Sequence, residues 1–457
     1  MNIAKPLLVV GAGFSGAVVA RELAEAGWMV RVIDSRDHVA GNCHTQRDLA
    51  TGIMVHVYGP HIFHTSNETV WAYVRRFGEW MPFVNRVKAH TGQGIFGLPI
   101  NLHTINQFFG QTLAPADARD FLALRADQSI DEPQNFEEQA LKFLGRELYE
   151  AFFRGYTLKQ WGCDPRELPA SILKRLPVRF NYNDNYYDSR YQAIPRDGYT
   201  QVVENILAHP NITVSLETTW ADTMKQEVEH VFFTGPLDEY YGYAEGRLGY
   251  RTVYWESECH TGDYQGNAVI NYTSPDVPWT RVHEHKHFAP WESHDQTLVF
   301  REFSKETTAE DVPYYPKRLS ADKAILARYV ARAEKETQVS FVGRLATYRY
   351  VDMHQVIAEA SAAKNITRRE FTSQEIVNRV LFAMMNEVAH LVSERVVGDA
   401  TDCDITLVNG YGFPRWQGGP VFMARELGLE KLGMEVDLLE KQSGPGFKRA
   451  NLHGLFE

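Results

Sequence analysis

The chain has 457 residues, of which 44% are hydrophobic and 23% charged, a balance typical of a globular enzyme and not of a disordered protein. Its 58 acidic and 47 basic residues give a formal net charge of −11, which argues against nucleic-acid binding and requires that an anionic ligand be held by a local group of arginines. The four cysteines are scattered, and no apolar run is long enough to cross a membrane, so we expect a cytoplasmic protein without disulfides or membrane insertion.

The segment from Pro6 to Asp34 has the pattern of a strand, a tight turn, a helix and a second strand. Apolar runs at residues 7–10 and 29–33 flank a G-x-G-x-x-G motif and an alanine-rich stretch at helical spacing. In this motif the glycines permit the turn, the approach of backbone N–H groups to a pyrophosphate and close packing of helix on strand, and the final acid accepts hydrogen bonds from a ribose. The segment predicts a dinucleotide site formed by Gly11, Gly13, Phe14, Ser15, Gly16 and Asp34.

The residues after Asp34 indicate which dinucleotide is bound. Ser35 and Arg36 follow at once, and Gly41 and Asn42 come shortly afterwards. This order resembles the FAD-binding signature of the flavoprotein oxidase and mutase superfamily, so FAD is favoured over NAD. The superfamily usually has two glycines before the asparagine, and the first of them is Ala40 here.

Three histidines lie around a Gly-Pro turn in residues 55–65, VHVYGPHIFHT. Their spacing is neither H-x-x-x-H nor paired with cysteines, so we expect no metal there. We interpret His56 and His64 as structural histidines. His61 comes directly after a turn that can bring the backbone near a flavin ring, and it is the functional candidate.

Other patterns predict local structure. Leucines and a phenylalanine at helical spacing predict an amphipathic helix over residues 136–153. The proline-rich residues 163–181 oppose a long helix and predict a loop-rich stretch. Alternation between Thr252 and His287 predicts antiparallel strands that are solvated on one face. Three histidines would share one strand face there, for which a solvated or substrate-side position is favoured over a metal site: His283, His285 and His287.

Several long motifs together resemble the bacterial UDP-galactopyranose mutases. They are YGPHIFHT, NRV at residues 85–87, LPINLHTINQ at 98–107, YTLKQWG at 156–162, KRLPVRFNYNDNYY at 174–187 and GRLATYRYVDM at 343–353. Because the motifs are long, ordered and spread over residues 5–362, the chain is identified as a member of this family.

The resemblance implies an α/β fold with three domains. A discontinuous Rossmann-like FAD-binding domain would comprise residues 1–80, 195–245 and 316–366. A small helical domain with a mobile lid would comprise residues 100–177, and an antiparallel sheet domain residues 81–99, 178–194 and 246–315. An α-helical extension would follow at 367–457.

The resemblance also implies the substrate site. Arg175, on the lid, and Arg281 would clamp the diphosphate, with Arg251 as a third candidate. Phe152 and Phe153 would flank the uracil, and Trp161 would line the sugar pocket. Four tyrosines would donate hydroxyls to the diphosphate: Tyr156, Tyr186, Tyr315 and Tyr350. Four residues would contact or orient the flavin: His61, Arg344, Asp352 and Met353.

The family reaction would interconvert UDP-galactopyranose and UDP-galactofuranose without net redox change, with N5 of reduced FAD as nucleophile. Catalysis by the protein would come from His61, Arg175 and Arg281. A related sugar remains an alternative substrate: N-acetylgalactosamine, arabinose or a 6-deoxy sugar. The alternative from another class is an FAD-dependent oxidoreductase of the amine-oxidase type, which shares the first motif but not the set of arginines and tyrosines.

Residues beyond about 365 do not belong to this pattern. Thr372 and Glu375 form a predicted capping box for a helix whose Ile376, Val380, Met384, Val388 and Leu391 would line one face. The following stretch, most specifically NGYGFPRWQGGP, resembles the C-terminal helical domain of 3-hydroxyacyl-CoA dehydrogenases. The catalytic His-Glu pair of those enzymes has no counterpart here. We therefore expect an appended packing or homo-oligomerisation module, with ligand binding as the alternative.

Overall fold

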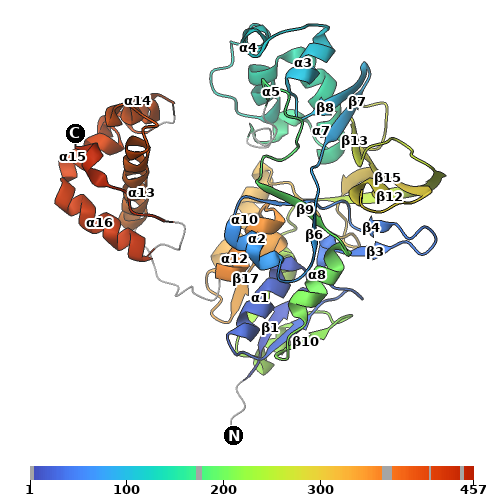
Figure 1. Ribbon diagram of the computed structural model, residues 1–457. Coiled ribbons are helices and arrows are strands. Elements are labelled where there is room, and N and C mark those ends of the chain that lie inside the picture. Colours follow the sequence, from blue (N-terminus) through green and yellow to red (C-terminus); the bar gives the residue numbers. More distant parts are fainter. Residues whose placement is uncertain (1–4, 171–177, 363–372, 411–412, 443–446, 457) are drawn as a thin grey trace. The chain divides into compact units, whose positions relative to one another are not determined.

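The structure is a computed structural model that describes residues 5–170, 178–362, 373–410, 413–442 and 447–456. The chain divides into two compact units, residues 1–365 and residues 366–457. Figure 1 shows their helices and strands along the sequence.

The N-terminal unit contains a parallel sheet in which the described strands follow the order β10-β2-β1-β11-β17. The predicted strand, turn, helix and strand are confirmed as β1, α1 (Phe14–Glu25) and β2. All four residues of β1 are buried, as expected for a parallel strand covered on both faces. The strands of this sheet are β1 (Leu7–Val10), β2 (Val30–Ile33), β10 (Ile212–Ser215), β11 (Val231–Phe233) and β17 (Val339–Phe341).

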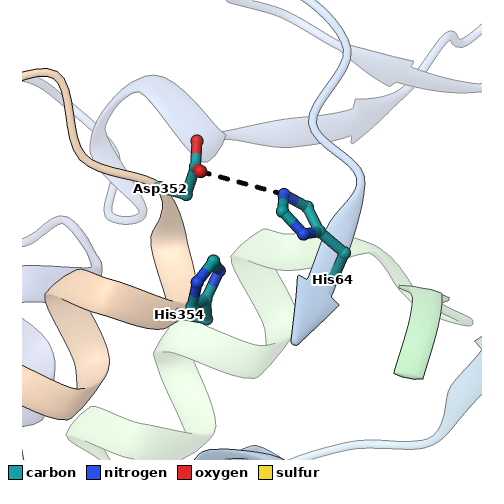
Figure 2. Close-up of side chains that lie close together, drawn as sticks. All are labelled: His64, Asp352 and His354. Carbon is teal, nitrogen blue, oxygen red and sulfur yellow. Dashed lines mark ion pairs between the residues drawn. The ribbon is translucent and has the colours of Figure 1, made fainter. Parts of the chain in front are cut away.

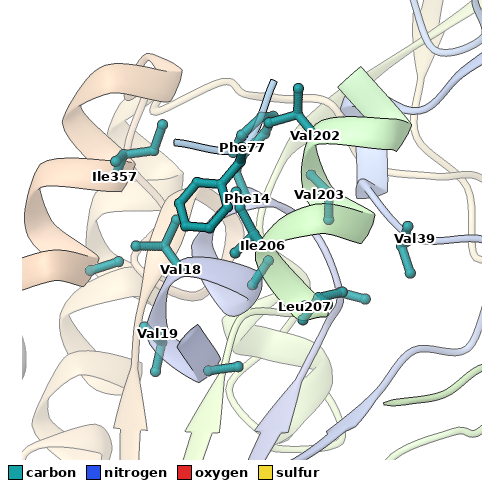
Figure 3. Close-up of a cluster of buried hydrophobic side chains, with 14 of the residues drawn as sticks. Phe14, Val18, Val19, Val39, Phe77, Val202, Val203, Ile206, Leu207 and Ile357 are labelled. Carbon is teal, nitrogen blue, oxygen red and sulfur yellow. The ribbon is translucent and has the colours of Figure 1, made fainter. Parts of the chain in front are cut away.

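Three helices bury one face of β1. Leu7 and Val9 join a cluster formed by α1, α8 (Gly198–Leu207) and α12 (Met353–Ala362), whose side chains interdigitate in Figure 3. Leu8 and Val10 point to the opposite face, where they meet residues of β11 and β17. This alternation, set by the pleat of the strand, fixes α1 on the sheet and places its N-terminus at the glycine-rich turn.

A second, larger sheet has the order β16-β12-β15-β14-β13-β7-β8 in the described chain. The pairing of β13 with β7 is parallel, and the other pairings are antiparallel, which confirms antiparallel strands in the region of residues 252–287. The strands are β7 (Val87–Thr91), β8 (Gly94–Leu98), β12 (Tyr250–Thr261), β13 (Val269–Tyr272), β14 (Arg281–Glu284), β15 (Gln296–Glu306) and β16 (Tyr315–Pro316).

The prediction that these strands are solvated on one face is wrong at both ends of the region. The first four residues of β12 are all buried, because α7 (Gly155–Trp161) packs on this part of the sheet. His283 and His285 are buried as well, with exposed fractions of 0% and 1%. The strand ends at Glu284, and His287 lies in a 3-10 turn, η6 (His285–Phe288), so the three histidines do not share one strand face.

The predicted helix over residues 136–153 is interrupted. The first helix, α5 (Phe136–Leu144), ends at Gly145, which has φ +79° and whose added Cβ would lie 2.7 Å from the Arg125 carbonyl oxygen. The chain continues through α6 (Arg146–Leu148), a π-helical turn, η2 (Tyr149–Arg154), and α7. The predicted apolar face is nevertheless buried, at Leu141, Leu144, Leu148 and Phe152.

The other described elements of this unit are short strands, turns and helices. In the region predicted as loop-rich, the described residues form the short turn η3 (Pro165–Glu167) and isolated bridges at Pro169 and Arg179, and residues 171–177 lie outside the described chain. Short strands are β3 (Thr45–Arg47), β4 (Met54–His56), β5 (Phe63–Thr65), β6 (Trp80–Pro82) and β9 (Tyr191–Pro195). The remaining helices of this unit are α2 (Glu68–Val74), α3 (Leu102–Phe109), α4 (Pro115–Ala123), α9 (Leu237–Tyr240), α10 (Ser320–Ala333) and α11 (Gly343–Ala346), with the 3-10 turns η1 (Gly41–Cys43) and η5 (Asp222–Glu227).

The C-terminal unit is helical. Its described helices are α13 (Ser373–Ser393), α14 (Ala400–Gly410), α15 (Pro420–Leu427) and α16 (Leu429–Gln442), with the short turns η8 (Arg415–Gln417) and η9 (Leu452–Leu455). The buried carboxylate of Asp404 caps α15 by accepting hydrogen bonds from the backbone nitrogens of Val421 and Phe422, both at 2.8 Å. Among the described residues, no helix has the length and apolar character needed to span a membrane.

The predicted apolar face of α13 is correct only in its second half. Val388 is buried and Leu391 packs against the core of this unit, whereas Val380 is 54% exposed. The buried face contains Met385 in place of Met384, because the face follows the contacts with α15 and α16. Thr372 and the side chains of Glu375 and Ile376 lie outside what the structure describes, so the predicted capping box stays a prediction.

Candidate active site and dinucleotide site

Contacts within the protein require glycine at two of the three positions of the glycine-rich motif and allow a larger residue at the third. Gly11 has φ +104°, and an added Cβ would lie 2.0 Å from the Thr234 hydroxyl oxygen. At Gly16 the Cβ would lie 1.9 Å from the carbonyl oxygen of Gly11. At Gly13 the nearest atom, in Gly41, would be 3.8 Å away. A Cβ at Gly13, where α1 begins, would make only ordinary van der Waals contacts, so the need for glycine there would come from a bound phosphate.

Asp34 ties this turn to the end of β2. Its Oδ2 accepts a hydrogen bond from the Ala12 nitrogen at 2.8 Å, and its Oδ1 accepts one from the Arg36 nitrogen at 3.0 Å. Nη2 of Arg36 in turn donates to Asn42 Oδ1 at 2.9 Å. The structure thus brings the predicted acid, arginine and asparagine together beside the turn, with Gly41 next to Gly13 and Ser35 exposed.

Arg344 links the glycine-rich turn to a cluster of tyrosines. It follows Gly343, whose added Cβ would lie 2.4 Å from Ser15 Oγ, so α11 abuts the N-terminus of α1. Its guanidinium lies over the rings of Tyr350 and Tyr315, at 4.3 and 5.1 Å. Its Nε and Nη2 are buried without a hydrogen-bond partner among the described residues. Buried donors of this kind indicate a site for an acceptor from a ligand.

Arg281 is held by a buried carboxylate. Glu302 Oε1 accepts from Nε and Nη2 of Arg281 at 2.9 and 2.7 Å, and Oε2 accepts from Nη2 at 2.7 Å. Burial by itself would raise the pKa of Glu302, but the charge of Arg281 and the hydrogen bond from His283 hold the pKa at about 2. The side chain of Arg281 is 25% exposed, and Nη1 is left for a further acceptor within the described structure.

The predicted tyrosines gather around this arginine. Tyr315 is within 3.5 Å of Arg281 Nη2, and its ring stacks on that of Tyr350 at 6.1 Å. Burial raises the pKa of Tyr156, while the nearby charge of Arg281 lowers it, and the neighbours of Tyr156 include Tyr186 and Tyr315. The net shift keeps the Tyr156 hydroxyl protonated at neutral pH, so it can donate a hydrogen bond to an anion.

His61 lies at the turn as predicted and is uncharged at neutral pH. Burial lowers its pKa to about 4, and the positive charges of Arg344 and Arg281 act in the same direction although the carbonyl of Gly59 opposes them. Its Nδ1 lies 2.8 Å from that carbonyl oxygen, and its own carbonyl accepts from the Tyr199 hydroxyl at 2.9 Å. These contacts fix the loop next to the two arginines.

Other predicted substrate residues are engaged within the protein. Phe152 and Phe153 are 3% and 6% exposed in the helical core, and Trp161 packs against the same core, so their substrate contacts stay predictions. Arg251 donates to the Gln160 carbonyl, to Ser304 and to Glu306, and its role at a phosphate likewise stays a prediction. Arg175 lies outside the described residues.

Asp352 lies at the start of α12, opposite a histidine that we interpreted as structural. Its Oδ2 is 4.0 Å from Nε2 of His64, and His354 completes a group of three, as Figure 2 shows. Met353 packs into the core beside the parallel sheet and accepts from the Cys43 thiol at 3.6 Å. His64 also lines a cavity of about 300 Å³ together with Tyr186, Tyr187, Ser66, Arg179, Asp188 and Ser189.

Sequence reasoning missed Glu302, the partner of Arg281. The two residues face each other across β14 and β15. The signal that could have found it is an acid at a buried strand position, which requires a cation. Strand register, however, cannot be derived from the local sequence around either residue.

A Rossmann-type glycine-rich turn joined through Arg344 to an arginine and tyrosine cluster defines a dinucleotide-binding enzyme with a site for an anionic ligand. Family models agree with this class. A UDP-galactopyranose mutase model matches residues 151–350, and an NAD(P)-binding Rossmann-like domain model matches residues 9–77.

Curated relatives match most of the chain. A probable UDP-galactopyranose mutase of Klebsiella pneumoniae is 56% identical over 356 residues, which cover 78% of this chain and 93% of the relative. A dTDP-fucopyranose mutase of Escherichia coli is 51% identical over 361 residues, which cover 78% and 96%. The crystal structure of a reduced UDP-galactopyranose mutase superposes with a TM-score of 0.63 at 15% identity, over 79% of this chain and 94% of that one, and supports the fold.

The chain belongs to the UDP-galactopyranose mutase family. A separate, shorter similarity involves 67 residues that are 43% identical to a peroxisomal bifunctional enzyme of Danio rerio, 15% of this chain and 9% of that protein.

Proposed function

We propose that this protein is a flavin-dependent mutase that interconverts UDP-galactopyranose and UDP-galactofuranose without net redox change. The observation that carries the proposal is the position of Arg281 among Tyr156, Tyr315 and Tyr350, next to Arg344 and the glycine-rich turn. Membership of the family supports the reaction class.

The residues present fit FAD. The space at Gly13, the side chains of Asp34, Arg36 and Asn42, and the unpartnered buried nitrogens of Arg344 form a cradle of the required kind. Reduced FAD would supply the nucleophile for the anomeric carbon when bound. Asp352 and Met353, at the start of α12, are further proposed contacts.

The diphosphate is the part of the substrate that this cluster can recognise. A guanidinium makes charge-assisted hydrogen bonds to phosphate, and Arg281 is already oriented by Glu302, so little side-chain freedom is lost when Nη1 engages an oxygen. Neutral phenols at Tyr156 and Tyr315 add donors. As the diphosphate leaves the sugar it gains charge, and the same donors would stabilise it more strongly then than in the bound substrate.

His61 is proposed to help order the loop next to the flavin. Because its imidazole is neutral, His61 adds no positive charge to a site that already contains the charges of Arg281 and Arg344. Arg175 would complete the clamp from the lid, although it falls outside the described residues.

The sugar is the least determined part of the proposal. The 51% identical relative is a dTDP-fucopyranose mutase, so dTDP-fucopyranose is the second candidate substrate. The two substrates differ in the base, in the 2′-hydroxyl of the nucleotide ribose and in the C6 hydroxyl of the hexose. A site that hydrogen-bonds a hydroxyl rejects the analogue lacking it far more strongly than an apolar pocket rejects an added one.

The test is to assay reduced and oxidised protein with UDP-galactopyranose, UDP-N-acetylgalactosamine, UDP-arabinopyranose and dTDP-fucopyranose. We expect turnover only with reduced protein, the highest kcat/KM with UDP-galactopyranose, and no stoichiometric consumption of reductant. Sugar oxidation in each turnover would move the protein to the amine-oxidase class. A higher kcat/KM with dTDP-fucopyranose would change the substrate and leave the class intact.

We further propose that the C-terminal unit is an appended packing or homo-oligomerisation module related to the C-terminal domain of 3-hydroxyacyl-CoA dehydrogenases. The motif NGYGFPRWQGGP, the similarity to a bifunctional enzyme and the separate hydrophobic core of residues 366–457 support this.

A further inference from the structure

We propose that His64, Asp352 and His354 form a binding site for a divalent transition-metal ion of the zinc type. His64 comes from strand β5, and the other two residues come from the start of α12, so the three side chains converge from two elements (Figure 2). Each offers one ligand atom, and these atoms all lie within 4.8 Å of one another. Two imidazoles and a carboxylate, with water in an open position, are a ligand set that Zn²⁺ accepts.

The present distances between the ligand atoms are short enough that side-chain movement alone would form the site. Nε2 of His64 and Oδ2 of Asp352 are 4.0 Å apart. In a tetrahedral zinc site, ligand atoms about 2 Å from the metal lie roughly 3.3 Å from each other. The ligands must therefore approach by about 1 Å. The side chain of Asp352 is 45% exposed and can make this adjustment. Its Oδ2 would bind the ion, and its Oδ1 would remain for the flavin contact proposed above.

The contacts of His64 favour the tautomer and the ring orientation that a metal ligand needs. Its Nδ1 lies 3.0 Å from Ser189 Oγ, a contact that can hold the proton on Nδ1 and leave the lone pair of Nε2 toward Asp352. Its ring stacks on Tyr187 at 3.8 Å, which limits its rotation.

His354 supplies the second, independent observation. Its Nδ1 is buried and has no hydrogen-bond partner in the part of the chain that the structure describes. Its ring lies 5.1 Å from that of His64 at an angle of 64°. A metal ion bound through this nitrogen would supply the missing partner.

A second group with similar composition provides an internal control. Asp263, Glu284 and His287 also lie within 4.8 Å of one another. The Glu284 carboxylate, however, already accepts three backbone N–H groups at 2.8 to 3.0 Å, and Lys286 Nζ lies 2.6 Å from Asp263. These contacts occupy the oxygens and bring a positive charge to the site, so we expect no ion there.

The cavity of about 300 Å³ that His64 lines would give an ion access to this side chain. Once bound, it would join the start of α12 to β5, two elements that are far apart in the sequence.

The experiment is a titration of full-length, flavin-loaded protein with Co²⁺, whose ligand-field absorption reports low coordination number, followed by displacement with Zn²⁺. We expect one Co²⁺ per chain and a rise in Tm with Zn²⁺. His64→Phe, which can keep the stacking on Tyr187, and His354→Phe should each weaken binding by more than 100-fold, and Ser189→Ala by about 10-fold. His287→Phe should leave binding unchanged.

Absence of the Co²⁺ signal in the folded, flavin-loaded protein would overturn the proposal. So would binding that survives both His354→Phe and Asp352→Asn, or binding that His287→Phe removes. If His64→Phe does not fold, these two variants at the half-buried start of α12 decide the outcome.

Discussion

Arg281 and Glu302 face each other across strands β14 and β15, and both oxygens of the buried carboxylate accept hydrogen bonds from the guanidinium. The pair therefore has two roles. It neutralises a charge in the interior, and it presents Arg281 to the proposed diphosphate site.

Arg281→Ala should affect stability as well as ligand binding. The substitution leaves Glu302 buried without its cation, so we expect a loss of about 3 to 5 kcal/mol in the free energy of unfolding. Adding Glu302→Gln should restore much of the stability without restoring UDP binding. Urea unfolding and calorimetric titration with UDP separate the two effects. Unchanged stability of the single variant would contradict this account of the pair.

Acidification should destabilise the protein through its buried histidines. Burial lowers the pKa of His56 to about 3 and of His61 to about 4, from an ordinary value of 6.5. The unfolded chain therefore binds more protons than the folded one in this range. The contribution of each neutral histidine to stability is fully present above pH 6.5 and is lost as the pH falls toward its folded pKa, about 4 for His61 and about 3 for His56.

The matching measurement is the free energy of unfolding as a function of pH for His56→Phe. This variant cannot take up the proton, so its stability should fall less steeply over the same range. His103→Gln, a substitution at an exposed histidine, should keep the wild-type slope. Equal slopes in all three proteins would argue against a buried, neutral His56.

Lys159 should stabilise the loop that precedes Arg281. Its Nζ lies 2.7 to 2.9 Å from four backbone carbonyl oxygens, those of Tyr272, Ser274, Val277 and Trp279. Lys159→Met removes the donor and leaves buried acceptors unpaired, so we expect a loss of about 1 to 3 kcal/mol in stability and faster amide exchange in residues 273–280. Lys305→Met, at a lysine that is 45% exposed, should change stability by less than about 0.5 kcal/mol.

Gly13→Ala and Gly16→Ala should both lose flavin binding, but for different reasons. A Cβ at Gly16 collides with the Gly11 carbonyl at 1.9 Å, so this variant should be poorly folded with or without flavin. At Gly13, φ is −76° and the nearest atom would be 3.8 Å from the Cβ, so the variant should fold normally. It should nevertheless bind FAD much more weakly, because the methyl group occupies the space proposed for the phosphates. Full flavin occupancy in Gly13→Ala would count against that placement.

Removal of residues 366–457 should leave a folded N-terminal unit. The two units have separate hydrophobic cores, so the truncated protein should keep flavin binding and turnover while its oligomeric state or solubility changes. Sedimentation and the mutase assay give both readouts. Loss of flavin with unchanged association would show that the extension serves the active site instead.

The sequence by itself determined the parts of this protein that depend on neighbouring residues. The glycine spacing and the apolar runs specified β1, the turn, α1 and β2, because each glycine acts on contacts within its own turn. The leucines of the helical region correctly predicted a buried face. The interruption at Gly145 follows from its approach to the Arg125 carbonyl, a contact between distant residues.

Only the tertiary structure decided which distant side chains meet. Arg281 and Glu302 are brought together by the register of β14 on β15, and a slip of one residue would turn one of them to the other face of the sheet. His64 meets Asp352 because α12 packs beside β5. Strand register and helix packing are set by the whole buried core rather than by local propensity, so the partners that fix the charge and orientation of the site residues could not be derived from the sequence.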